Sequence, residues 1–232
     1  MAGLAVSGSN PDVDLLYDIN GLAKEAPHWF DRLMAFAGQY GLLLAMVLLI
    51  LWCWWSVRGR GGEDAASSVA ALAWAPLAAG VAVLVSMPIR GFVGRPRPSA
   101  DHQGLDVLTG GGPGFSFVSE HAALMTAMAV ALFVAHRRFG LAGLALALAE
   151  GFCRVYAGAH YPTDVVGGFA LGTAVALLLS PLASALLTPL AKAVERSPRA
   201  GALIRARRTA APETVISGTR TGAEARERDL AA

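Results

Sequence analysis

Three polar segments, separated by long apolar stretches, hold the residues of this chain best suited to chemistry. The segments read "RGFVGRPRP", "FVSEHA" and "RVYAGAHYPTD". The candidates in these segments are three of their arginines, a serine, two histidines and an aspartate: Arg90, Arg97, Ser119, His121, Arg154, His160 and Asp164. Arginine side chains present planar sets of donors that match the geometry of phosphate oxygens. Three arginines around one pocket would therefore suit a phosphoryl group and the charge that develops on it during transfer.

The histidines and the aspartate would supply the remaining parts of such a reaction. A histidine held by a carboxylate has a fixed tautomer, and its other ring nitrogen is free to attack. His160 and Asp164 are four residues apart, so the carboxylate can reach back to the ring if a helix begins after Pro162. The second histidine, His121, could protonate a leaving oxygen. Because the arginines already provide positive charge, we expect no metal and no cofactor.

The composition of the chain predicts a membrane protein. Of its 232 residues, 55% are hydrophobic and 16% are charged, which is too apolar for an ordinary soluble domain. Five apolar runs are near the ~20 residues needed to span a bilayer, and they are residues 34–57, 68–89, 119–135, 141–156 and 165–190. The third and fourth runs reach that length only by including polar residues, which at a membrane edge are costly and usually functional. We expect an all-α fold, an integral-membrane bundle of about five to six transmembrane helices.

The distribution of basic residues predicts the orientation of this bundle. Arginine and lysine are concentrated at residues 58–60, at residues 137–138 and at the start of the C-terminal tail. By the positive-inside rule, these regions face the cytoplasm. The loops at residues 90–118 and 157–164 then lie outside, together with all three polar segments. The first outer loop breaks the rule with three arginines, which suggests that they hold something anionic; simple scatter of charge is the alternative.

The two ends of the chain differ from the apolar middle. The apolar pattern of residues 10–33 predicts an amphipathic helix. Asn10 can cap this helix and Pro11 fits its first position, while Pro27 breaks the pattern. This helix would either lie on the bilayer or pack on the bundle as a soluble helix. The chain thus divides into an N-terminal amphipathic segment at residues 1–33, a membrane domain at 34–190 and a disordered cytoplasmic tail at 191–232.

Each candidate catalytic or phosphate-binding residue also has an ordinary structural interpretation. An arginine at the end of a span is often an anchor whose head reaches the interface, and a histidine there is often structural. Ser119 is equally suited to cap the following helix and to bind phosphate. Glu120, next to it, is favourable in the first turn of a helix. The convergence of three distant clusters on one membrane face favours the catalytic interpretation.

The order and spacing of the clusters resemble the signatures of the type 2 phosphatidic acid phosphatase (PAP2) superfamily of membrane lipid phosphatases. Those signatures are a basic residue, six others and Arg-Pro; then Pro-Ser-Gly-His; then Ser-Arg, five others, His, three others and Asp. Residues 90–168 match them with every gap correct. The resemblance implies that His160 is the nucleophile, through a phosphohistidine, with Asp164 as its orienting partner and His121 as general acid. It implies phosphate binding by Arg90, Arg97, Ser119 and Arg154.

The chain departs from these signatures at four positions. Arg90 stands in place of the usual lysine, Val118 and Glu120 in place of Pro and Gly, and Cys153 in place of the Ser before Arg154. Glu120 is the most informative departure, because an acidic residue there resembles the bacterial bacitracin-resistance undecaprenyl-diphosphatases, which carry Asp. Glu120 would tune the site, either by orienting a phosphate or by repelling it.

These observations predict a metal-independent phosphatase, a hydrolase that converts undecaprenyl diphosphate to undecaprenyl phosphate and phosphate. It would act on the extracytoplasmic face of a bacterial plasma membrane, recycle the lipid carrier for peptidoglycan synthesis and confer bacitracin tolerance. Its partners would be the membrane and a polyprenyl diphosphate lipid, with no nucleic acid. One alternative is the same chemistry on phosphatidylglycerol phosphate, phosphatidic acid or a prenyl-linked sugar phosphate. A more distant alternative is a non-catalytic membrane transporter or scaffold.

Overall fold

The computed structural model describes residues 10–58, 65–109, 114–197 and 201. Within these ranges the regular structure is helical, and strands are absent apart from one isolated bridge between Pro96 and Phe115. The helices are α1 (Pro11–Glu25), α2 (His28–Phe36), the π-helical turn η1 (Ala37–Gly41), α3 (Leu42–Arg58), α4 (Ala65–Val93), α5 (Pro98–Asp101), α6 (Glu120–Ala135), α7 (Arg137–Tyr156), α8 (Pro162–Leu178) and α9 (Ser180–Glu195). The prediction of an all-α fold is confirmed.

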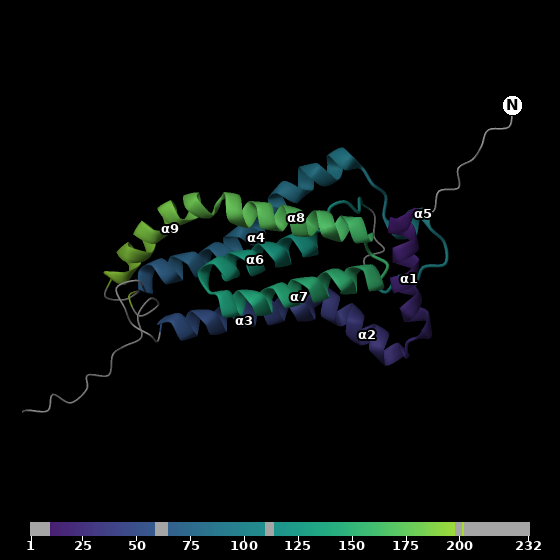
Figure 1. Cartoon of the computed structure of the whole chain (residues 1–232), viewed down its shortest axis with the longest axis horizontal. Coiled ribbons are helices and arrows are strands. Elements are labelled where there is room, and N and C mark those ends of the chain that lie inside the picture. The colour runs from purple at the N-terminus through teal and green to yellow at the C-terminus, as the bar shows by residue number, and fades with distance from the viewer. Residues whose placement is uncertain (1–9, 59–64, 110–113, 198–200, 202–232) are drawn as a thin grey trace, which may run out of the picture.

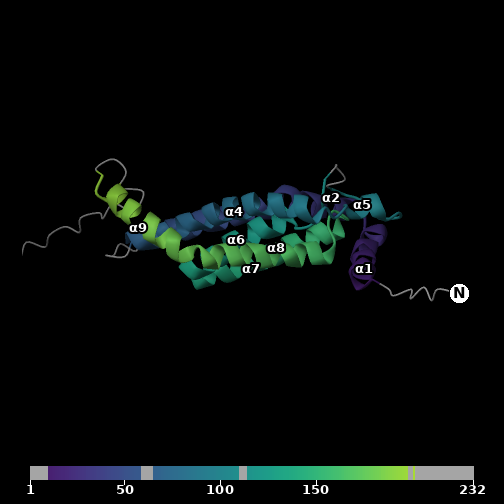
Figure 2. The same cartoon turned by 90° about the horizontal axis from the view of Figure 1, so that it is seen from above.

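Most of the long helices run side by side along one axis of the molecule. Figures 1 and 2 show α3, α4, α6, α7 and α8 in this bundle, with α6 in its middle, while α1 lies across one end. The two ends of the bundle therefore differ. One end carries α1, α5 and the loops before α6 and α8, and the other carries the turn from α6 to α7.

Several helices have the length and composition of membrane spans. The continuous run α2–η1–α3 (His28–Arg58), α4 and α7 are each long and apolar enough to cross a bilayer. Helices α8 and α9 meet at a bend of 51°, where Pro181 follows the break, and together they would make a fourth span. Helix α6 is equally apolar but has only 16 residues. The count of five to six transmembrane helices remains a prediction.

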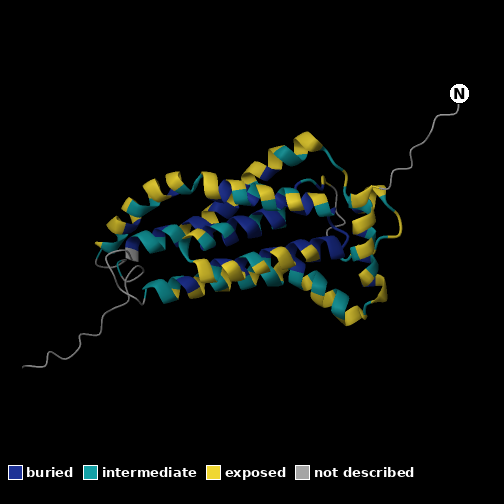
Figure 3. Ribbon diagram, viewed as in Figure 1, coloured by how far each residue is buried: buried dark blue, intermediate teal, exposed yellow. Residues whose placement is uncertain are grey.

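Outward-facing apolar side chains support this membrane assignment. In α3, only Met46 and Cys53 are buried. Large side chains on its other faces are exposed, among them Leu44, Leu48, Leu51, Trp52 and Trp55. Figure 3 shows exposed residues along the outer faces of the bundle and buried ones in its middle. A soluble protein rarely exposes so large an apolar surface, whereas lipid is a suitable solvent for it.

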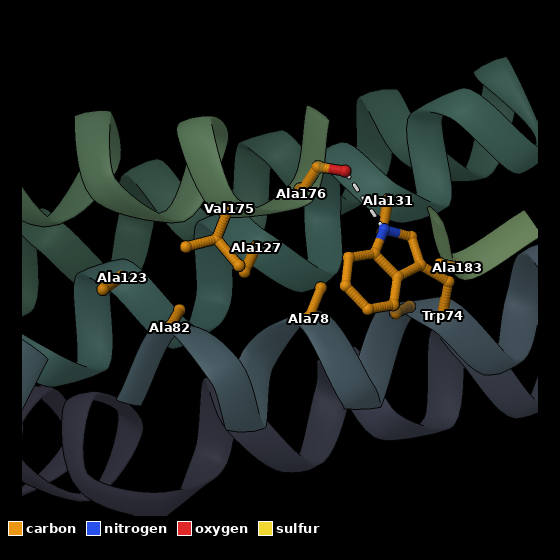
Figure 4. Close-up of a cluster of buried hydrophobic side chains, with 10 residues drawn as sticks. Trp74, Ala78, Ala82, Ala123, Ala127, Ala131, Val175, Ala176 and Ala183 are labelled. Atoms are coloured by element: carbon orange, nitrogen blue, oxygen red, sulfur yellow. Dashed lines mark hydrogen bonds between the residues drawn. The ribbon is translucent and has the colours of Figure 1, made fainter. Parts of the chain in front are cut away.

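The core of the bundle is built from small residues. Alanines of α4, α6 and α8 meet around Trp74, whose Nε1–H donates to the carbonyl oxygen of Ala176 at 3.1 Å (Figure 4). Small side chains let helix backbones approach closely, which is the usual basis of helix packing in membranes. Helices α6 and α8 approach closely. A Cβ atom at Gly168 would lie 2.6 Å from the carbonyl oxygen of Ser119.

The ends of the described chain agree with the sequence in part. The side chain of Asn10 caps α1, Pro11 is its first residue, and the helix stops before Pro27, all as predicted. Helix α1 packs on the bundle against α7 and α8, and the residues after Pro27 continue into α3 instead of remaining with α1. At the other end, α9 extends to Glu195, so the predicted tail begins with a helical segment. Residues 198–200 and 202–232 of that tail lie outside the described residues.

Candidate active site

The fold brings the three polar segments together at the end of the bundle where α1 lies. Backbone hydrogen bonds connect them directly. The Ser116 N–H donates to the carbonyl oxygen of Arg95 at 2.8 Å, and the Ser119 N–H donates to that of Asp164 at 3.0 Å. The segment before α6 is therefore fixed to the first cluster at one point and to the third cluster at another.

His160 lies between α7 and α8 and is only 3% exposed. Its Nδ1 is 2.9 Å from the carbonyl oxygen of Ser116. Since a carbonyl oxygen can only accept, Nδ1 is the donor and carries the proton, which leaves the lone pair on Nε2. Burial lowers the pKa of His160 below its ordinary value, although Asp164 opposes this effect. The ring is thus held neutral with one nitrogen able to act as a nucleophile.

Asp164 takes its place because α8 begins at Pro162, as the sequence analysis required. Its Oδ2 accepts from the N–H of Tyr161 at 2.9 Å and lies 3.8 Å from His160 Nδ1. Its Oδ1 accepts from Arg95 Nη1 at 2.9 Å. The carboxylate therefore lies at ion-pair distance from His160, while His160 Nδ1–H donates its direct hydrogen bond to the Ser116 carbonyl oxygen. The His160 ring is thus held by a backbone carbonyl as well as by a carboxylate, and no sequence pattern indicates such a carbonyl.

Arg154, at the end of α7, contacts the second histidine. Its Nη2 donates to His121 Nδ1 at 3.0 Å, so that nitrogen is an acceptor and the proton of His121 sits on Nε2. The Nη1 of Arg154 donates to the carbonyl oxygen of Gly38 at 3.2 Å and to Gln39 Oε1 at 3.3 Å. Its Nε is 4.0 Å from Glu150 Oε1. Four groups from three helical segments thus orient this one guanidinium.

The contact with Gly38 depends on a close approach of two backbones. A Cβ atom at Gly38 would lie 2.8 Å from the Cβ of Cys153. Gly38 lies in η1, where the chain widens into a π-helical turn, a feature often found at functional sites. The absence of a side chain here lets the turn present its carbonyl to Arg154.

Arg90 and Arg97 lie at a cavity of about 300 Å³. The cavity is lined by Met87, Arg90, Gly91, Arg97, Gly114, Phe115 and Glu120. Glu120 Oε2 accepts from Arg90 Nη2 at 2.5 Å. Glu120 is therefore more than a favourable first-turn residue, since it occupies one arm of a predicted phosphate ligand.

Ser119 precedes α6 at the capping position, yet its side chain makes no capping hydrogen bond. Its Oγ is buried, and so are the Nε atoms of Arg90 and Arg154. Within the described part of the chain, none of these three atoms has a hydrogen-bond partner. Buried polar atoms are normally satisfied, and phosphate oxygens would be suitable acceptors for all three donors.

Sequence patterns missed several residues that lie around this site. Arg95 falls in the spacer of the first signature, and Asp12 belongs to α1; both contact the segment that carries Asp164. Gln39 and Glu150 reach Arg154 from apolar runs. A usable signal existed for Glu150, because an acidic residue four positions before an arginine on a helix suggests a pair. In the ranges that the structure describes, no group of three or more His, Cys, Asp or Glu residues could hold a metal ion.

The model of the PAP2 superfamily matches residues 65–186, more than half of the chain. The chain belongs to the PAP2 superfamily. The matched region contains all three clusters and five of the helices that carry them. The protein is therefore a member of a family of membrane phosphatases, and its helical bundle is the scaffold on which these residues meet.

Curated relatives and solved structures agree with this assignment. The chain is 25% identical to the undecaprenyl-diphosphatase BcrC of Bacillus subtilis over 64% of its length and 72% of the relative's. It is 27% identical to a lipid A 1-phosphatase of Rhizobium johnstonii, over 71% of this chain and 72% of that one. The crystal structure of LpxE from Aquifex aeolicus superposes with a TM-score of 0.51 at 21% identity, covering 76% of this chain and 98% of the other. That likeness confirms the fold.

Proposed function

We propose that this PAP2 protein hydrolyses undecaprenyl diphosphate to undecaprenyl phosphate and inorganic phosphate through a phosphohistidine on His160. The single observation that carries the proposal is the hydrogen bond from His160 Nδ1 to the Ser116 carbonyl, which leaves Nε2 as the attacking atom. The arginines and Ser119 around it supply donors for phosphate. Arg90, Arg97, Arg154 and Ser119 would bind the phosphate groups, with Asp164 adding negative charge beside the nucleophile.

The reaction would proceed in two steps. Nε2 of His160 attacks the terminal phosphorus, and the bond to the bridging oxygen breaks with its electron pair leaving on the lipid phosphate. His121, the predicted general acid, stabilises that oxygen by a hydrogen bond from its Nε2–H. Water then attacks the phosphohistidine, the phosphorus–nitrogen bond breaks, and the proton of the water passes to an oxygen of the departing inorganic phosphate. His160 recovers its lone pair and inorganic phosphate is released.

The contact between Arg154 and His121 favours a diphosphate over a phosphate monoester. Arg154 donates to Nδ1 of His121, so the ring is neutral in this arrangement and offers one N–H. A departing lipid phosphate is a weak base, with a pKa of about 6 for its conjugate acid, and a hydrogen bond is enough to stabilise it. An alkoxide leaving from phosphatidic acid would need a full proton. The name of the relative BcrC, an undecaprenyl-diphosphatase, supports the same substrate.

Placement at the end of the bundle also suits a lipid. The head group could reach the arginines of the cavity while the chain stays in hydrocarbon along the exposed apolar faces. From the positive-inside rule, we place the active site on the extracytoplasmic face of a bacterial plasma membrane. There the enzyme would recycle the lipid carrier of peptidoglycan synthesis, and its overproduction would raise bacitracin tolerance.

Phosphate release by the purified protein tests this function. The protein in detergent, with EDTA present, is given undecaprenyl diphosphate, phosphatidic acid and phosphatidylglycerol phosphate in parallel. His160→Ala is compared with His136→Ala, a histidine at the opposite end of the bundle between α6 and α7. We expect EDTA-resistant release from the diphosphate, lost in His160→Ala and retained in His136→Ala.

The other outcomes of this assay are informative in different ways. Preference for a glycerolipid would retain the mechanism but refute the proposed substrate. Full activity in His160→Ala, or no release from any substrate, would show that the proposed nucleophile or the proposed activity is wrong. Labelling of Asp14→Cys by a membrane-impermeant thiol reagent in intact cells would test the orientation, since Asp14 is exposed on α1 and both native cysteines are buried.

A further inference from the structure

Arg95 lies in the spacer of the first signature, yet its side chain contacts the third cluster and α1 directly. Its Nη1 donates to Asp164 Oδ1 at 2.9 Å and to Thr163 Oγ1 at 2.8 Å. Its Nη2 donates to Asp12 Oδ2 at 2.6 Å. The guanidinium carbon also lies 3.6 Å from the centre of the Tyr161 ring, a favourable distance for a cation above an aromatic face. Arg95 thus connects α1 to the helix that carries Asp164.

Asp12 uses both oxygens of its carboxylate on the first turn of α8. Oδ1 accepts the Thr163 N–H at 2.9 Å, and Oδ2 accepts the Thr163 hydroxyl at 2.6 Å. The first amides of a helix have no partner within it, and negative charge is favoured there. Burial alone would raise the pKa of Asp12, but hydrogen bonds from Thr163 and Arg95 outweigh it and hold that pKa below its ordinary value. Asp12 is therefore an ionised cap supplied to α8 by a separate helix.

The rest of α1 is fixed to the same end of the bundle. Asp12, Leu16 and Asn20 are four residues apart and share one face of the helix. Leu16 is fully buried in an apolar cluster with residues of α6, α7 and α8. The Nδ2 of Asn20 donates to the carbonyl oxygens of Tyr156 at 2.8 Å and Asp106 at 2.9 Å, and its Oδ1 accepts the Asp106 N–H at 2.9 Å. Helix α1 thus bridges the end of α7 and the start of α8, the two helices on either side of His160.

We propose that Asp12 is a positioning residue of the active site, which holds Arg95, and through Arg95 the carboxylate of Asp164, in place beside His160. This proposal rests on the proposed function, in which His160 attacks phosphorus. Without the charge of Asp12, Arg95 retains Asp164 as its carboxylate partner and draws it away from the His160 ring. The first amides of α8 lose the negative charge that faces them at the same time. An N-terminal helix that only attached the protein to the membrane would have no such effect.

The expected signature is a loss of turnover without a matching loss of substrate affinity. Asp12 acts on the nucleophile and its carboxylate, while the predicted phosphate ligands Arg90 and Ser119 lie on other segments. Hydrogen bonds to charged groups of this kind correspond to about 10- to 100-fold in an equilibrium or rate. We expect Asp12→Asn to lower kcat by about that factor and to change KM by less than about threefold.

The experiment measures kcat and KM for full-length protein in detergent, with farnesyl diphosphate as the probe. Asp12→Asn is compared with Asp14→Asn, the same chemical change at an exposed position of the same helix. Asp12→Glu keeps the carboxylate and should restore part of the lost turnover. Arg95→Lys keeps the charge but loses the two-armed geometry. It should lower kcat like Asp12→Asn, and the double variant should be no slower than the slower single one.

The outcomes separate this proposal from the proposed function. If Asp12→Asn turns over like Asp14→Asn while His160→Ala is inactive, the positioning role is refuted and the phosphatase remains. An equal loss in Asp14→Asn, or a loss confined to KM, would also refute it. If the wild-type protein releases no phosphate, the proposed function fails and the positioning role fails with it. Should Asp12→Asn not elute as a folded protein, Arg95→Lys decides by the same criteria.

Discussion

The close approach of α8 to α6 leads to a prediction with a defined size. A Cβ atom at Gly168 would lie 2.6 Å from the carbonyl oxygen of Ser119 and 2.8 Å from the Cβ of Ala122. Ordinary contact begins near 3.4 Å, so Gly168→Ala must separate the two helices locally by about 0.8 Å. Gly168 is one turn after Asp164, whose carbonyl oxygen accepts the Ser119 N–H. The displacement therefore falls between the second and third clusters of the site.

Both the stability and the rate should respond to this single methyl group. Overpacking of a well-packed core costs about 1–3 kcal/mol, and a misplacement near 1 Å can cost about 100-fold in rate. We expect Gly168→Ala to lower kcat/KM for undecaprenyl diphosphate by about 10- to 100-fold and to lower the unfolding temperature in detergent. Gly80→Ala is the matched control, since Gly80 is exposed on α4 with nothing within 4 Å of its Cβ position. Equal activity and equal unfolding temperature in the two variants would refute the packing argument.

Three further predictions concern the electrostatics of the site. Glu120→Gln removes the carboxylate that pairs with Arg90 and should lower KM for the diphosphate. Because Glu120 is over a third exposed, solvent screening limits the change in KM to about fivefold. An increase in KM would show that Glu120 orients the substrate instead. Gln39→Leu removes one of the acceptors that orient Arg154 and should raise KM severalfold in steady-state assays, whereas an unchanged KM would show that the other contacts suffice. Burial lowers the pKa of His160, so its ring stays neutral at pH values below the ordinary histidine pKa of about 6.5. The acid limb of kcat/KM plotted against pH should therefore lie below about pH 6.5. An acid limb above that pH would contradict the neutral, buried ring.

The sequence predicted the class of the fold because lipid imposes a simple rule on it. A helix that crosses hydrocarbon must satisfy its own backbone and carry apolar side chains, so long apolar runs are visible without any tertiary information. Local signals were equally reliable at Asn10 and Pro27, where a cap and a break depend on neighbours in the chain. The three clusters could be found in the sequence because their residues stand at the spacings of the PAP2 signatures.

The remaining parts of the site depend on contacts between distant segments. Ser116 presents a backbone carbonyl to His160, and every residue type has such a carbonyl, so no pattern could single it out. Ser119 looked equally suited to cap α6 and to bind phosphate, and its unsatisfied Oγ emerged only in the fold. Likewise, the sequence left open whether Glu120 is a first-turn carboxylate or part of the site, and its contact with Arg90 requires two helices to meet.

The clearest case is the contact of Asp12 with Arg95 and Thr163, which are 83 and 151 residues away. The sequence by itself determined that α1 forms and that the chain has helices apolar enough to enter a membrane, and it predicted a set of residues for phosphate transfer. Only the tertiary structure decided that α1 packs across the end of the bundle, because the partners of a charged side chain are fixed by the packing of Leu16 and Asn20 on α7 and α8. Spacing along one chain contains no record of that packing.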